Sequence, residues 1–224
     1  MAKGSGSTRM KGPGSGGAII ARLPYSTPTA GEYIPVTDRG MTAQQRAYIT
    51  AFEKQRRNSR SEYGLTVDKD GNIVKERRGN YRAIRWYTSE IPRDGILTHV
   101  HPVSKKMASM SNFARSVGKS LSGGDIRTAI STNLKEIRAV TPNYTFSMRR
   151  PAGGWGVSAK DFYKDYDATW NRNLARLKAY ADAGGDIKTL NQRYGRLNVA
   201  LDHQTMRELA KKYGFIYTKS RRIK

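Results

Sequence analysis

Two histidines separated by one residue, His99 and His101, directly follow a short apolar segment at 95–98. A run of this length predicts a buried strand. Strand side chains alternate between the two faces, so both imidazoles are expected to point the same way and to be able to bind one metal ion. The chain contains no Cys and three His, which leaves imidazole and carboxylate as the ligands for any zinc site.

A third ligand is available in Asp125, which lies at the start of a segment with apolar residues at helical intervals up to about Arg138. A helix beginning there would present the carboxylate at its N-terminus. Three protein ligands with an open fourth position are typical of catalytic zinc. The alternative is that Asp125 caps the helix without any metal, since Asp is a common N-cap residue and Ser122 could act similarly.

The remaining hydrophobic pattern predicts an α+β domain, because helical and alternating segments are mixed along the chain. A helix is expected after the N-cap Thr42, and a hairpin with the turn Asp70-Gly71 is expected to join strands at 63–67 and 72–74. The other predicted elements are strands at 81–87, 144–148 and 155–157, and helices at 159–181 and 202–213.

Composition divides the chain into three parts. Residues 1–17 are rich in Gly, Ser and basic residues and predict a flexible basic tail. Residues 18–158 are predicted to form the α+β domain, including an N-terminal strap and helix. Residues 159–224 are predicted to form a basic helical C-terminal region that ends in a basic tail.

His99-Val-His101-Pro102 and Ser122-Gly-Gly-Asp125 together resemble the signature of the JAB/MPN/JAMM zinc metalloproteases, in particular the RadC-like branch. The resemblance implies a curved mixed sheet with flanking helices, zinc held by His99, His101 and Asp125, and a Ser122 hydroxyl that supports the oxyanion. It also implies an upstream general acid/base, matched here by Glu62 because 62–72 resembles the first hairpin of the family.

The chemistry expected of such a site is hydrolysis of a peptide or isopeptide bond by zinc-activated water, with a carboxylate moving the proton. The spacing departs from the family, since twenty residues separate His101 from Ser122. The segment 103–120 is then either a lid or an inactivating insertion.

The sequence leaves three of these assignments open. The two histidines could form a structural pair that binds no metal. Ser120 could take the place of Ser122, although only Ser122 has the Ser-x-x-Asp spacing. Glu53, Glu76 or Glu90 could take the place of Glu62, because all three also precede the histidines.

The charge predicts an acidic partner, because 41 Lys and Arg against 18 Asp and Glu leave a formal net charge of +23. Nucleic acid bound without sequence preference is the first expectation; an acidic protein, or simply a solvated basic surface, is the alternative. No apolar run is long enough for a membrane span. The predicted nucleic-acid contacts are Lys211, Lys212, Lys219, Arg221 and Arg222.

Short motifs around Thr98-His99 and Asn133-Leu-Lys-Glu-Ile-Arg138 also resemble a domain found in tailed-phage head-associated proteins of the Mu F type. This resemblance implies a phage-associated zinc hydrolase located in the virion or the host cytoplasm, beside DNA or other virion proteins. The competing hypothesis is a non-catalytic virion protein that uses the same domain as a scaffold.

Overall fold

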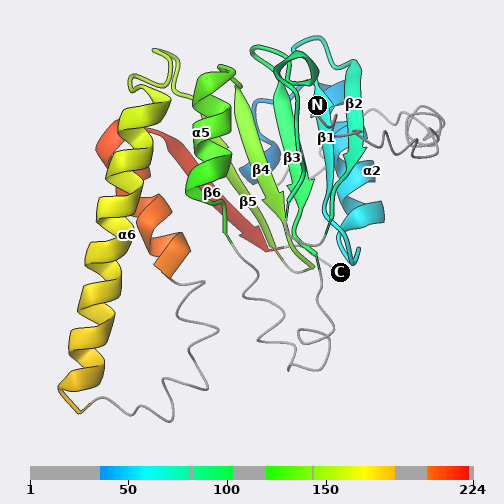
Figure 1. The fold of residues 1–224 in the computed structure, drawn as a ribbon. Helices are drawn as coiled ribbons and strands as arrows, with labels where there is room; N and C mark the ends of the chain where they lie inside the picture. The colour runs from blue at the N-terminus through cyan, green and yellow to red at the C-terminus, as the bar shows by residue number, and fades with distance from the viewer. Residues whose placement is uncertain (1–35, 81–82, 103–119, 143, 185–200, 222–224) are drawn as a thin grey trace, which may run out of the picture.

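The computed structural model describes residues 36–80, 83–102, 120–142, 144–184 and 201–221. A six-stranded mixed sheet in the order β2-β1-β3-β4-β5-β6 forms its centre, and helices cover both faces (Figure 1). The α+β class is therefore confirmed. The strands are β1 (Tyr63–Val67), β2 (Ile73–Arg78), β3 (Ile96–Val100), β4 (Glu136–Val140), β5 (Tyr144–Arg149) and β6 (Ile216–Arg221).

The central strands β3 and β4 are parallel, whereas all other neighbouring strands are antiparallel. Parallel neighbours need a crossover connection, and here that connection contains α5 (Gly123–Ser131). The metal-ligand candidates therefore belong to one β3–α5–β4 unit in the middle of the sheet.

Each face of the sheet has its own apolar cluster. On one side, α2 (Ala43–Arg56) packs Ile49 and Phe52 against side chains of β1 and β3 such as Leu65. On the other side, α5, α6 (Ala159–Asp182) and the helix at 201–213 pack against β4 and β5, with Phe146 and Phe162 in the shared cluster. None of the helices within the described ranges is long and apolar enough to span a bilayer.

The predicted start of α2 is confirmed in detail. The Thr42 hydroxyl accepts a hydrogen bond from the Gln45 backbone, and the Gln45 side chain accepts one from the Thr42 backbone. Gln45 also donates to the Asp68 carbonyl at 2.8 Å, which ties the helix to the turn between β1 and β2. That turn passes through Gly71, whose φ of 98° favours glycine.

Two predicted strands are absent from the described structure. Residues 83–87 form no strand. Ile84 and Trp86 instead lie over Gly64, where an added Cβ would clash with the indole. Residues 155–157 also form no strand. Trp155 instead enters the core and donates its indole N–H to the Leu134 carbonyl.

The predicted helix from Asp125 to Arg138 is wrong beyond Ser131, where α5 ends. Asn133 adopts a positive φ of 53°, a conformation that stops a helix. The chain then becomes β4, the strand beside β3. Helix-like spacing arose because Ile126 on α5 and Ile137 on β4 both point into the same apolar cluster.

The C-terminal region contains the two predicted helices, but most of the expected basic tail is a strand. β6 pairs along the full length of β5, from Tyr144 opposite Arg221 to Arg149 opposite Ile216. Phe162 from α6 and Met206 from the helix at 201–213 share a cluster with β4 and β5. The predicted tail at 1–17 lies outside the described residues. So do residues 18–35 of the predicted strap at 18–37 and residues 103–119 of the predicted segment at 103–120.

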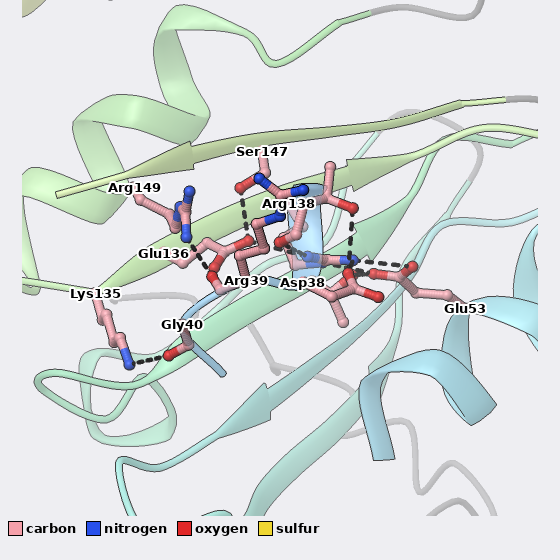
Figure 2. Close-up of polar contacts among 11 residues, drawn as sticks. Asp38, Arg39, Gly40, Glu53, Lys135, Glu136, Arg138, Ser147 and Arg149 are labelled. Carbon is pink, nitrogen blue, oxygen red and sulfur yellow. Dashed lines mark hydrogen bonds and ion pairs between the residues drawn. The ribbon is translucent and has the colours of Figure 1, made fainter. Parts of the chain in front are cut away.

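A buried ionic network lies on the α2 face of the sheet (Figure 2). Arg138, which is 1% exposed, binds Asp38 at 2.7 Å, Glu53 at 2.8 Å and Glu136 at 3.0 Å. The network reaches β3 because the Thr98 hydroxyl donates to Glu53 at 2.9 Å. It joins α2, β3, β4 and the short 3-10 helix η1 (Val36–Asp38).

Candidate metal centre

β3 turns the two histidines toward α5. Thr98 and Val100 face α2, as the Thr98 bond to Glu53 and the place of Val100 in the α2-side cluster show. Leu97 and His99 therefore face the other side, and Leu97 packs in the α5-side cluster. His99 is 5% exposed, and its Nε2 lies 3.1 Å from His101 Nε2. The predicted convergence of the two rings is confirmed.

The N-terminus of α5 brings Asp125 to the same place. Ser122 is the N-cap, and its hydroxyl accepts from the Asp125 backbone and donates to Asp125 Oδ2 at 2.8 Å. The Ser122 backbone donates to the same Oδ2 at 2.7 Å. The other oxygen, Oδ1, lies 3.5 Å from His99 Nε2. Asp125 thus caps the helix with one oxygen and faces the histidines with the other.

Two of the three donor separations in this group are close to those of a tetrahedral zinc site. One donor atom from each of His99, His101 and Asp125 lies within 4.8 Å of the other two. Bonds of about 2.0–2.2 Å in tetrahedral geometry place neighbouring donors about 3.3 Å apart. The separations of 3.1 and 3.5 Å from His99 Nε2 bracket that value. The donor set and the spacing therefore fit zinc.

The same arrangement has an explanation without metal. One imidazole could donate an Nε2 proton to the other, and Asp125 would then serve the helix cap alone. The Nδ1 of His99 is buried without a hydrogen-bond partner among the described residues. A zinc-binding imidazole usually directs that second nitrogen to an acceptor, so packing in the apolar cluster has to hold the His99 ring.

The register of the sheet predicts that Glu62 lies near the histidines. It immediately precedes β1, and its neighbour Tyr63 pairs with Val100. Continuation of this register sets Glu62 opposite His101. Because strand side chains alternate between the two faces, Glu62 is expected on the same face of the sheet as Gly64. Gly64 pairs with His99. Glu62 is not one of the three residues grouped within 4.8 Å, so its place near the ligands is inferred from the strand register alone.

The competing acidic residues and Ser120 are engaged elsewhere. Glu53 belongs to the buried Arg138 network on the opposite face. Glu76 is paired with Arg56 at 2.9 Å, and Glu90 is paired with Arg77. Ser120 is buried and lies 2.6 Å from the Tyr217 hydroxyl. None of these four residues belongs to the group of His99, His101 and Asp125.

Tyr166 supports the site and was missed by the sequence interpretation. Its ring covers Gly123, where an added Cβ would lie 2.5 Å from the ring, and the Gly123 backbone N–H donates to its hydroxyl oxygen. Burial raises the pKa of Tyr166 well above its usual range, and the Asp202 and Asp125 carboxylates raise it further. The Gly-Gly pair after Ser122 was the only signal in the sequence of this close approach.

The basic C-terminal residues predicted to bind nucleic acid lie, where the structure describes them, on two elements, the helix at 201–213 and β6. Lys212 pairs with Asp165, which raises the pKa of Lys212, and Lys219 lies 4.2 Å from the centroid of the Tyr144 ring. Arg221 ends β6, Lys211 is exposed on the helix at 201–213, and Arg222 lies outside the described residues.

His203, the third histidine, lies apart from the ligand group. Its Nδ1 lies 2.8 Å from the Tyr217 hydroxyl. Burial, together with the nearby Lys219 and Arg207, lowers the pKa of His203 to about 4. His203 is therefore a half-buried residue outside the ligand group.

Comparison with protein-family models, with curated proteins and with solved structures finds no match to this chain. Function must therefore be inferred from the residues themselves.

Proposed function

We propose that the protein is a zinc-dependent hydrolase of peptide or isopeptide bonds, with a domain of the JAB/MPN type. The observation that carries this proposal is the convergence of His99, His101 and Asp125 with donor separations suited to tetrahedral zinc. Bound zinc would supply Lewis acidity, lowering the pKa of water toward neutrality and polarising a carbonyl group.

In this proposal, residues of the protein orient the metal ligands and transfer the proton. Ser122 orients Asp125 by donating to Oδ2, which leaves Oδ1 directed at His99. Glu62, on the same face and beside His101 in register, is the group proposed to take a proton from water and return it to the leaving amine. Support of an oxyanion by Ser122 would require its hydroxyl to turn away from Asp125.

The first experiment is elemental analysis of purified wild-type protein and of three single variants. We expect about one zinc per chain in the wild type and loss of zinc in His101→Ala and Asp125→Ala. His203→Ala is the matched control, because His203 lies outside the ligand group, and it should retain zinc. A folded wild-type protein that takes up no zinc would refute the metal centre.

The second experiment separates metal binding from catalysis. Glu62→Gln should retain zinc, because Glu62 is outside the ligand group. Its hydrolysis of a peptide or isopeptide library should fall by about 10²–10⁴. Zinc binding without hydrolysis by the wild type would favour the scaffold hypothesis. The association with a phage head stays a prediction from short motifs.

A further inference from the structure

We propose that the end of α2 and the β1–β2 hairpin form a binding surface for the phosphate backbone of nucleic acid. Three residues, Arg57, Arg60 and Arg78, provide the charge, and we refer to them as the arginine surface. It is independent of the metal centre and differs from the C-terminal residues that the sequence suggested.

Side-chain contacts place Arg56 and Arg78 at the ring of Tyr63, and Arg57 and Arg60 are close to these residues in the chain. Arg78 is the cross-strand partner of Tyr63, and its guanidinium lies 5.8 Å from the centroid of that ring. Arg56, at the end of α2, lies 4.3 Å from the same centroid. Arg78 also donates to the Ser61 hydroxyl at 3.4 Å, and Arg60 is the residue before Ser61 in the chain. Arg57 directly follows the helix as its C-cap.

The surrounding acidic residues do not neutralise these three cations. Glu76 and Arg78 lie on the same face of β2, because strand side chains alternate between the two faces. Glu76 is nevertheless bound to Arg56 at 2.9 Å, and its side chain is only 3% exposed. None of the three members forms an ion pair with an acidic residue within the described ranges. Arg60 and Arg78 are exposed, and Arg57 is partly exposed.

The chemistry of this surface suits phosphate, and the net charge of +23 favours a polyanion over a single peptide carboxylate. Guanidinium groups bind phosphate oxygens through paired N–H donors, and stacking on an aromatic ring limits the conformations that the side chain can adopt. Tyr63 is half-buried beneath Arg56 and Arg78, so its ring is not open to a base. The surface therefore provides charge without base recognition, which predicts binding independent of nucleotide sequence.

The test is fluorescence anisotropy of the full chain with a labelled DNA duplex of mixed sequence, repeated with the corresponding RNA. The test variant is Arg57→Gln/Arg60→Gln/Arg78→Gln. The matched control, Lys160→Gln/Lys164→Gln/Lys178→Gln, removes the same charge from exposed positions on α6. Circular dichroism checks that both variants are folded. A third variant, Arg57→Lys/Arg60→Lys/Arg78→Lys, keeps the charge but loses the paired N–H donors of the guanidinium groups.

We expect the test variant to bind DNA at least about tenfold more weakly than the control. The slope of log affinity against log salt should fall by about 3, since each lost phosphate contact contributes about 0.9. The Arg→Lys variant should retain the salt slope. Equal losses in the test and control variants would overturn the proposal, as would polyglutamate binding as tightly as DNA. Preference for RNA over DNA would support the surface and identify its source of phosphate.

Discussion

Replacing Arg138 with methionine tests whether the buried network on the α2 face stabilises the fold. Arg138→Met keeps most of the apolar volume but leaves Asp38, Glu53 and Glu136 buried near one another with no counter-charge from Arg138. Breaking a buried ion pair costs about 3–5 kcal/mol. A protein of ordinary stability has about 5–15 kcal/mol in total, so the variant should fold with much of its stability lost.

The assay is urea unfolding followed by circular dichroism. With a denaturant dependence of about 2 kcal/mol per molar, a loss of about 4 kcal/mol lowers the urea midpoint by about 2 M. Arg172→Met is the control, because the Arg172–Glu208 pair is solvent-exposed. Such surface pairs contribute about 0–1 kcal/mol.

The pH dependence of the stability of Arg138→Met provides a second measurement on the same variant. Burial raises the pKa of Glu136 even beside Arg138, and removal of the guanidinium should raise it further. Because the pKa of Glu136 is higher in the folded state than in the unfolded state, its contribution to stability is full at low pH. This contribution is lost as pH rises through the folded-state pKa. Arg138→Met should therefore lose less stability, relative to wild type, at pH 5 than at pH 7. A midpoint shift no larger than that of Arg172→Met would refute the reasoning.

Three further predictions concern the site and its surroundings. Ser122→Ala should lower stability by about 1 kcal/mol through loss of the cap and weaken zinc binding about 10–100-fold through loss of Asp125 orientation, measured by urea unfolding and chelator competition. Gly123→Ala should destabilise by about 1–3 kcal/mol, because its Cβ would lie 2.5 Å from the Tyr166 ring; an unchanged urea midpoint would contradict this packing. His203 has a folded pKa of about 4 against 6.5 unfolded, so stability should fall as pH decreases from 6.5 toward 4. After allowance for partial exposure the loss is about 1–2 kcal/mol, and His203→Gln should remove it.

The sequence predicted the local elements of the site better than the sheet around it. His99 and His101 were placed correctly because alternation along a single strand is a local property. The helix start at Ser122 and Asp125 followed from local capping chemistry. The identity of β4 was missed because Ile137 also fits a helical period, and only the positive φ of Asn133 separates the helix from the strand.

Long-range partners could not be predicted from sequence patterns. Arg138 was assigned to the end of a helix, although it is buried among carboxylates that lie 100 and 85 residues away in the chain at Asp38 and Glu53. The pairing of β6 with β5 was missed for a related reason. An edge strand with alternating exposure, such as Ile216–Arg221, resembles a polar tail when its partner is unknown.

The parallel pairing of β3 and β4 changes the meaning of the long spacing between His101 and Ser122. Both residues are fixed by the crossover unit, His101 through its backbone bond to the Val140 carbonyl and Ser122 through its cap on α5. Lengthening a connection between fixed ends costs about 0.6 kcal/mol for each doubling. The ligand positions and the length of the intervening chain can therefore vary independently, and shortened or replaced versions of 103–119 can be engineered while the ligand group stays in place.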